Sequence, residues 1–175
     1  MTPPTTPYTL PAMLNIDLNA QYFHPTIAGH WKTDSLPDFI GIIAGDGTML
    51  ALEETEDYVD RRPRYDIRPA GLTSIDSFAG NPENYFNEVT PYIHRAPIIG
   101  TEAYAICGEG VMGNEGFVAV VNPRGLVWAA CFSVSNPFYE VRVVDHCVAA
   151  TSTHEIIWRF PVVRPWEIGF TYLDF

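Results

Sequence analysis

The sequence predicts a mainly β or α+β protein, with one domain built on a twisted antiparallel sheet of about six to eight strands and one or two short helices. Strand-like runs separated by short turns fill the second half of the chain, and 15 prolines and 13 glycines supply many turn positions. Of the 175 residues, 47% are hydrophobic and 13% aromatic, enough for a packed core. This length fits one domain.

The N-terminus is rich in proline and threonine, and residues 1–11 are predicted to form an extended tail before a globular domain over residues 12–175. The tail lacks the positive charge and apolar run of a secretion signal, and the three cysteines suit reduced, buried thiols. We therefore expect a cytoplasmic protein. Alternation of Leu14, Ile16 and Leu18 with polar residues predicts a strand over residues 12–23.

The middle of the chain predicts one hairpin and two helices. The apolar run Phe39–Ala44, the glycine turn at residues 45–47 and the run Thr48–Glu53 indicate a β-hairpin. The segment Glu53–Arg64 suits a short exposed helix, because its acids precede its arginines as the helix dipole favours. Capping by Asn81, with Pro82 in the first turn, predicts a helix over residues 82–90 that covers a face or edge of the sheet.

The second half predicts an antiparallel meander, in which consecutive strands are joined by short turns. The turns are Asn122–Gly125 and Ser135–Pro137. The strand-like runs are Ala103–Cys107, Gly116–Val121, Leu126–Val134, Phe138–Asp145, Cys147–Thr153 and His154–Pro161.

Charge is the clearest indication of function. The chain has 21 acidic against 10 basic residues, a net charge of -11. Such a surface repels nucleic acid and anionic membranes, and it favours a basic protein partner. The acidity is concentrated in residues 34–66, which hold nine carboxylates and three arginines. No run of apolar residues is long enough to span a membrane.

A partner-binding surface is predicted at five acids, with a solvated acidic face as the alternative. These acids are Glu53, Glu54, Glu56, Asp57 and Asp60. Nothing in the sequence selects one pair of them for hydrolysis, and no EF-hand pattern is present.

The remaining motifs do not define a catalytic, cofactor or metal site. The G-x-G-x-x-G run at Gly108–Gly113 precedes a strand rather than a helix, which makes it a flexible connection rather than a nucleotide loop. Histidines and cysteines do not occur at zinc-binding spacing. A nucleophile pair of Cys131 or Cys147 with His154 stays open, although the apolar surroundings of Cys131 favour an inert thiol.

The stretch Leu126–Phe138, followed by Ile157–Pro161, resembles the bacterial immunity proteins that inhibit polymorphic or contact-delivered toxins. That group is similar in being small, acidic, cytosolic and built on an antiparallel sheet. The resemblance implies inhibition by covering the active site of a basic toxin, and it assigns no site residue. Two other functions stay open: an enzyme or ligand-binding protein with an aromatic pocket and Cys147 or His154, and a component of an assembly with the N-terminus as an arm.

Overall fold

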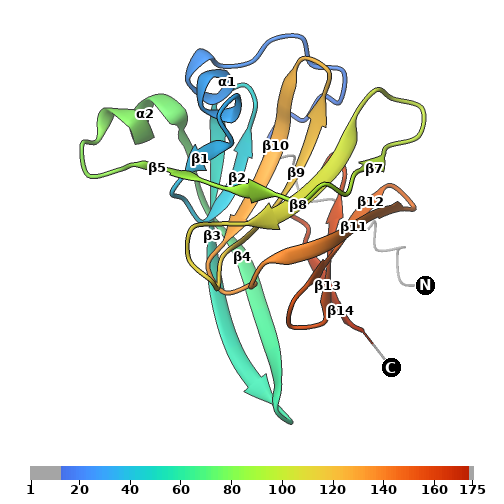
Figure 1. Cartoon of the computed structure of the whole chain (residues 1–175). Helices are drawn as coiled ribbons and strands as arrows, with labels where there is room; N and C mark the ends of the chain where they lie inside the picture. The colour runs from blue at the N-terminus through green and yellow to red at the C-terminus, as the bar shows by residue number, and fades with distance from the viewer. Residues whose placement is uncertain (1–12, 174–175) are drawn as a thin grey trace, which may run out of the picture.

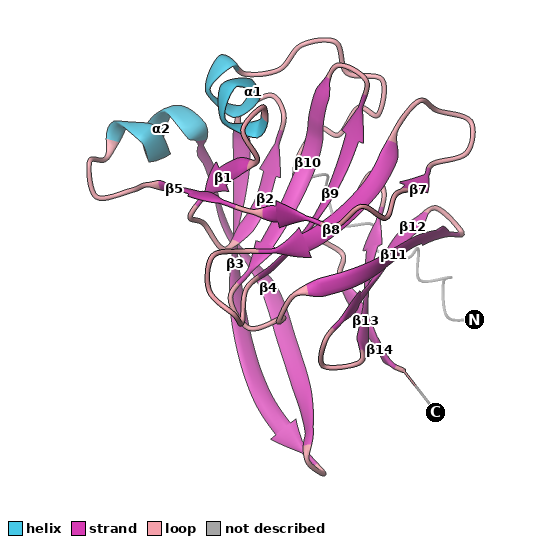
Figure 2. Ribbon diagram, viewed as in Figure 1, coloured by secondary structure: helices cyan, strands magenta, loops and turns pink. Residues whose placement is uncertain are grey.

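The computed structural model describes residues 13–173 and places most of them in three antiparallel sheets (Figures 1 and 2). An eight-stranded sheet carries a four-stranded sheet on one face, and two short helices with a two-stranded sheet on the other. The predicted class, mainly β with two short helices in one domain, is confirmed. The tail predicted over residues 1–11 lies outside the described residues.

The eight-stranded sheet has the order β4-β3-β2-β10-β9-β8-β6, and β7 is a second partner of β8. Its strands are β2 (Gly41–Ala44), β3 (Thr48–Val59), β4 (Arg62–Ser74), β6 (Thr90–Pro91), β7 (Ala96–Pro97), β8 (Tyr104–Glu109), β9 (Gly116–Asn122) and β10 (Gly125–Phe132). β2 and β3 form the predicted hairpin. Its turn requires Gly47, where φ is +96° and a Cβ would lie 2.8 Å from the His24 ring.

The strand predicted over residues 12–23 is wrong, because this segment pairs with no neighbouring strand in the part of it that is described. A buried side chain fixes it instead: the Asn122 amide nitrogen donates to the carbonyls of Leu18 and Ala20, at 3.2 and 3.0 Å. The Asn122 carboxamide oxygen also accepts from the Arg124 and Gly125 N–H groups, which closes the predicted turn between β9 and β10.

The four-stranded sheet is a meander with the order β11-β12-β13-β14. Its strands are β11 (Phe138–Val144), β12 (Cys147–Ser152), β13 (Ile156–Pro161) and β14 (Gly169–Tyr172). The sequence predicts β11–β13 in one sheet with the preceding strands, and that is wrong; it gives no prediction of β14. The chain changes sheets between β10 and β11, where Asn136 has φ of +60° and Pro137 has no N–H to donate.

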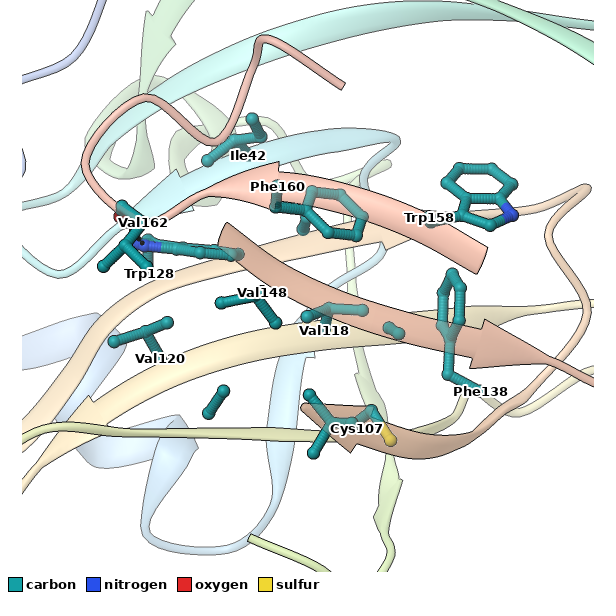
Figure 3. Close-up of a cluster of buried hydrophobic side chains, with 14 of the residues drawn as sticks. Ile42, Cys107, Val118, Val120, Trp128, Phe138, Val148, Trp158, Phe160 and Val162 are labelled. Carbon is teal, nitrogen blue, oxygen red and sulfur yellow. Dashed lines mark hydrogen bonds between the residues drawn. The ribbon is translucent and has the colours of Figure 1, made fainter. Parts of the chain in front are cut away.

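The main core lies between these two sheets (Figure 3). Its largest side chains include Trp128 from β10 and Trp158 and Phe160 from β13, all fully buried. The Trp128 indole nitrogen donates to the Val162 carbonyl at 2.8 Å, and the Phe138 ring meets Trp158 edge-on. Aromatic burial therefore holds the two sheets together.

A second core covers the other face of the eight-stranded sheet. It packs α1 (Pro25–Trp31), α2 (Ile75–Gly80) and the two-stranded sheet of β1 (Ser35–Pro37) and β5 (Phe86–Glu88) against that face. Alternate residues of each central strand enter the two cores, as Ile42 and Ile43 do.

The helix predicted over residues 82–90 is wrong, although a shorter helix lies just before it. α2 begins at Ile75, where the Ser74 hydroxyl accepts from the Ser77 N–H at 3.1 Å. Asn81 forms a turn in place of a helix cap, because its side chain accepts from the Glu83 N–H at 3.0 Å. The backbone beyond this turn pairs with β1 as strand β5.

The helix predicted over Glu53–Arg64 is also wrong, because this segment is the distal half of the β3–β4 hairpin. Its two strands are joined by Asp60 and Arg61, with φ of +52° and +64°. Two consecutive positive φ angles define the tight turn that matches the twist of a hairpin. The acids and arginines that suggested a helix dipole therefore face each other across two strands.

Candidate functional site

The candidate site is the distal half of the β3–β4 hairpin, because this element carries all five acids of the predicted partner surface. β3 pairs with β2 only through Met49–Ala51, so beyond Ala51 its one sheet neighbour is β4. The resulting ribbon projects from the body of the eight-stranded sheet (Figure 1). We call residues 52–69 the ribbon.

Strand alternation divides four of the five acids between the two faces of the ribbon, and the fifth, Asp60, lies in the turn. Glu53 and Asp57 lie on the outer face, with Arg68 and Arg64 as their cross-strand neighbours. Opposite charges in these positions attract, so the outer face has mixed rather than uniformly negative charge. Residues 53–68 hold six carboxylates and four arginines. The local net charge is therefore much smaller than the run of acids in β3 indicates.

Glu54 lies on the inner face and contacts the connection between β10 and β11. Its carboxylate accepts from the Ser133 N–H at 3.1 and 3.2 Å and also from the Ser133 hydroxyl. Burial raises the pKa of Glu54, and the hydrogen bonds from Ser133 oppose that rise. Glu54 therefore fixes the base of the ribbon to the body and is not free to bind a partner.

Tyr65 continues this inner face and is a residue that the sequence analysis missed. Its ring packs on Trp158 and Phe170, with centroid distances of 4.9 and 5.7 Å. Its hydroxyl lies 3.1 Å from His154 Nδ1. Burial, followed by the nearby charge of Glu56, raises the pKa of Tyr65, so the hydroxyl stays protonated. The one feature of the sequence that indicates this contact is an aromatic residue placed between charged residues, Arg64 and Asp66.

The contacts of the inner face extend almost to the tip of the ribbon. The Tyr172 hydroxyl donates to the Pro63 carbonyl at 2.7 Å, and the Arg62 guanidinium lies 5.1 Å from the Tyr172 ring centroid. The cross-strand neighbours of Pro63 and Arg62 are Tyr58 and Val59, which are 57% and 44% exposed. The tip therefore presents an aromatic and an aliphatic side chain on a ribbon that is held in place from below.

The structure does not gather the five acids on one face. Glu54 and Glu56 lie on the inner face, Glu53 and Asp57 on the outer face, and Asp60 in the turn. All five belong to one projecting element, and residues 57–64 around the Asp60–Arg61 turn form its tip. Nearby Glu56 raises the pKa of Tyr58 at the same tip.

The cysteine and histidine pairs that the sequence left open are not formed. Cys147 begins β12 and His154 lies beyond the other end of that strand. Cys131 packs in the core on the helix side of the eight-stranded sheet, whereas Tyr65, the partner of His154, belongs to the core on the opposite side. Burial raises the pKa of Cys131 to about 12, which keeps the thiol protonated and unreactive at neutral pH.

Cys131 lines a cavity of ≈ 90 Å³ together with Phe39, Phe117 and Phe132. Small-molecule sites usually occupy about 300–1,000 Å³, so this cavity is too small for most ligands. Among residues 13–173, no group of three histidine, cysteine or acidic side chains could hold a metal ion.

The glycine-rich loop after β8 is followed by β9, as predicted, and not by a helix. The Glu115 carboxylate accepts from the N–H groups of Val111 and Met112 at 3.0 and 3.2 Å. A nucleotide loop would offer these donors to phosphate. In this chain the Glu115 carboxylate already occupies these N–H donors.

Within residues 13–173, no helix has the length and apolar character needed to cross a bilayer. A comparison of the chain with protein-family models, curated proteins and solved structures finds no match.

Proposed function

We propose that the chain is a cytoplasmic immunity protein, which binds a basic bacterial toxin and covers its active site with the tip of the ribbon. The observation that carries this proposal is the ribbon itself. Beyond Ala51 it leaves the body of the sheet (Figure 1), and apart from Glu54, which Ser133 engages, it offers four acids of the predicted partner surface. An element of this shape can enter a concave site that a flat sheet face cannot reach.

Long-range charge and local contacts have separate roles in this proposal. The net charge of -11 belongs to the whole molecule and would speed its encounter with a cationic partner. The ribbon is much closer to neutral, so its pattern of acids and arginines would fix the orientation of binding. Tyr58, exposed at the tip, is the side chain best suited to anchor the contact, because aromatic residues dominate binding energy at interfaces.

The ribbon is suited to recognition by side chains rather than by strand addition. β4 lies at the edge of the eight-stranded sheet, and an exposed edge can recruit another strand. Pro63 and Pro69 remove backbone donors from this edge, which discourages such pairing. A partner therefore meets charged side chains and the tip.

The ribbon is also ordered before binding. Tyr65 packs on Trp158, and Tyr172 bonds to the Pro63 carbonyl, so little conformational entropy remains to be lost. A preorganised tip favours tight association.

The test uses the protein encoded next to this chain's gene, because a toxin and its inhibitor are inherited together. We expect a 1:1 complex that blocks the toxin and whose association slows as salt rises. The triple variant Asp57→Asn, Tyr58→Ala and Asp60→Asn should bind at least about tenfold more weakly, since it removes an aromatic anchor and two charges. It leaves Glu54 untouched, so the base of the ribbon is preserved.

The control variant changes Glu83→Gln and Glu88→Gln, which removes the same charge from exposed positions outside the ribbon. If the triple variant and the wild type, both folded, bind equally well, the ribbon is not part of the interface. Inhibition that depends on no part of this chain's acidic surface would reject the proposal as a whole.

A further inference from the structure

A groove at the end of the eight-stranded sheet opposite to the ribbon tip gathers aromatic and basic side chains that the proposed function does not use. Its volume is ≈ 600 Å³. It lies among the C-terminal end of α1, the connection between β6 and β7, and the β9–β10 turn. The floor includes the buried Ile106 and Val121, and the half-buried Trp31, Tyr92 and Tyr104 also line it. We call it the basic groove.

Three basic side chains from separate segments line this groove: Lys32, Arg95 and Arg124. Lys32 is the one lysine of the chain. Arg95 donates to the Tyr104 hydroxyl at 3.0 Å, and its guanidinium lies 4.7 Å from the Tyr104 ring centroid. Among residues 13–173, neither Lys32 nor Arg95 has a carboxylate within ion-pair distance. Their charges are therefore available to a ligand.

Two nearby acids compensate part of this positive charge. Arg124 has a 3.8 Å contact with Glu102, and both side chains are largely exposed, so the pair is weak. Asp34 is the one carboxylate among the lining residues described. The groove is thus locally positive in a chain whose net charge is -11.

The other seven basic residues belong to other parts of the molecule. They are Arg61, Arg62, Arg64 and Arg68 in the ribbon, and Arg142, Arg159 and Arg164 in the four-stranded sheet and its connections. Lys32, Arg95 and Arg124 come from parts of the chain far apart in sequence, and the fold brings them to one concave site.

We propose that the basic groove binds a small anion that carries a planar ring, of about the size of a nucleotide. The ring would pack against Trp31 and Tyr92, and Lys32 and Arg95, which have no carboxylate partner, would hold its phosphate or carboxylate group. The volume of ≈ 600 Å³ falls within the usual range of about 300–1,000 Å³ for small-molecule sites. Ile93, 98% exposed in the lining, adds an apolar contact at the opening.

The charge of the whole molecule limits the size of this ligand. At physiological salt, charges act over about 8 Å, so a small anion in the groove is attracted mainly by the nearby cations. A long polyanion would extend over the acidic remainder of the surface and be repelled. The ligand is therefore a small molecule rather than a nucleic acid.

Calorimetric titration of the full chain with adenosine monophosphate and with indole-3-acetate tests the proposal and separates a phosphate from a carboxylate ligand. At least one should bind with a dissociation constant of about 0.1 mM or below. Adenosine and inorganic phosphate, each with one half of the recognised chemistry, should bind at least about tenfold more weakly. In NMR spectra the Trp31 indole N–H signal should move, while that of buried Trp128 stays in place.

Lys32→Gln and Arg95→Gln should each weaken binding about tenfold, since each removes one charge-assisted hydrogen bond. Arg142→Gln, which removes an exposed arginine of the four-stranded sheet, is the matched control and should bind as the wild type does. The proposal fails if neither ring anion binds with a dissociation constant of about 0.1 mM or below, if Arg142→Gln matches the groove variants, or if a single-stranded oligonucleotide binds more tightly than the small anions.

Discussion

Tertiary contacts give Glu54 an environment that differs from that of its neighbours in the sequence. It belongs to the acidic run of β3, and its sequence context is that of a solvated carboxylate. In the folded chain it accepts hydrogen bonds from Ser133, 79 residues away. Burial raises its pKa above the ordinary value of 4.5, because the charged form is poorly solvated there. No local pattern in the sequence indicates this partner.

Glu54→Gln should change how stability depends on pH. The raised pKa means that the folded chain holds this proton more tightly than the unfolded chain does. Wild-type stability therefore loses a contribution as pH rises from about 4.5 through the raised pKa of Glu54. Glutamine does not titrate, so the variant lacks this loss. The unfolding free energy of the variant minus that of the wild type should therefore increase as pH rises through this range. Urea unfolding at several pH values measures the difference.

Ser133→Ala gives the complementary variant for the same effect. It removes the hydroxyl donor that opposes the rise in pKa, so the loss of stability with pH should become larger than in the wild type. Parallel pH profiles for the wild type and both variants would show that the Glu54 carboxylate does not titrate differently in the folded chain.

The β3–β4 hairpin was wrongly predicted as a helix because its order of charges is compatible with both structures. Acids before arginines suit a helix dipole, but they also place Asp57 opposite Arg64 when the chain reverses between them. The turn decides between the two. This turn requires positive φ at Asp60 and Arg61. Arginine rarely adopts positive φ, so its presence at this position does not indicate a turn.

Arg61→Gly should stabilise the protein by about 0.5–1 kcal/mol, because glycine relieves the strain of positive φ and suits the second position of this turn. Denaturant unfolding measures the gain. His146→Gly, at the equivalent position of the β11–β12 turn with φ of +60°, should give a similar gain.

Arg62→Gly, one residue later and the first residue of β4, is the contrasting control and should destabilise, because glycine weakens a strand and the contact of Arg62 with the Tyr172 ring is lost. A loss of stability in Arg61→Gly as large as that in Arg62→Gly would mean that the arginine side chain at the tip matters more than its backbone strain.

At the scale of the whole molecule, two sheets are joined through one aromatic core. Trp128 and Trp158 are both fully buried there (Figure 3), but their indole N–H groups differ. Trp128 donates to the Val162 carbonyl, whereas the Trp158 N–H has no partner among the described residues. The connection after β13 is therefore fixed to the eight-stranded sheet by a buried hydrogen bond.

Trp128→Phe should cost about 1–2 kcal/mol more of the free energy of unfolding than Trp158→Phe. Both changes shorten a buried aromatic side chain, but the first also leaves the Val162 carbonyl without its donor, while the second removes an N–H that is already unpaired. Chemical denaturation of the two variants in parallel measures this difference. Equal losses would indicate that the hydrogen bond adds nothing beyond packing.

The sequence alone determined the class of the fold and most strands of its second half, because alternation and turn residues act over a few neighbours. Gly45–Gly47 and Asn122–Gly125 specified their turns for the same local reason. Local patterns also gave the acidic character of the chain and the inert setting of Cys131.

Three features follow from the folded chain and not from local sequence: the division of the strands between two sheets, the acids of the ribbon that face the body, and the basic residues that share a groove. Each depends on contacts between residues far apart in the chain, such as Glu54 with Ser133 or Arg95 beside the β9–β10 turn. The free energy of hydrophobic burial depends on the total apolar area buried and not on which residues pair. A sequence pattern that indicates a buried or charged residue therefore does not indicate its partner.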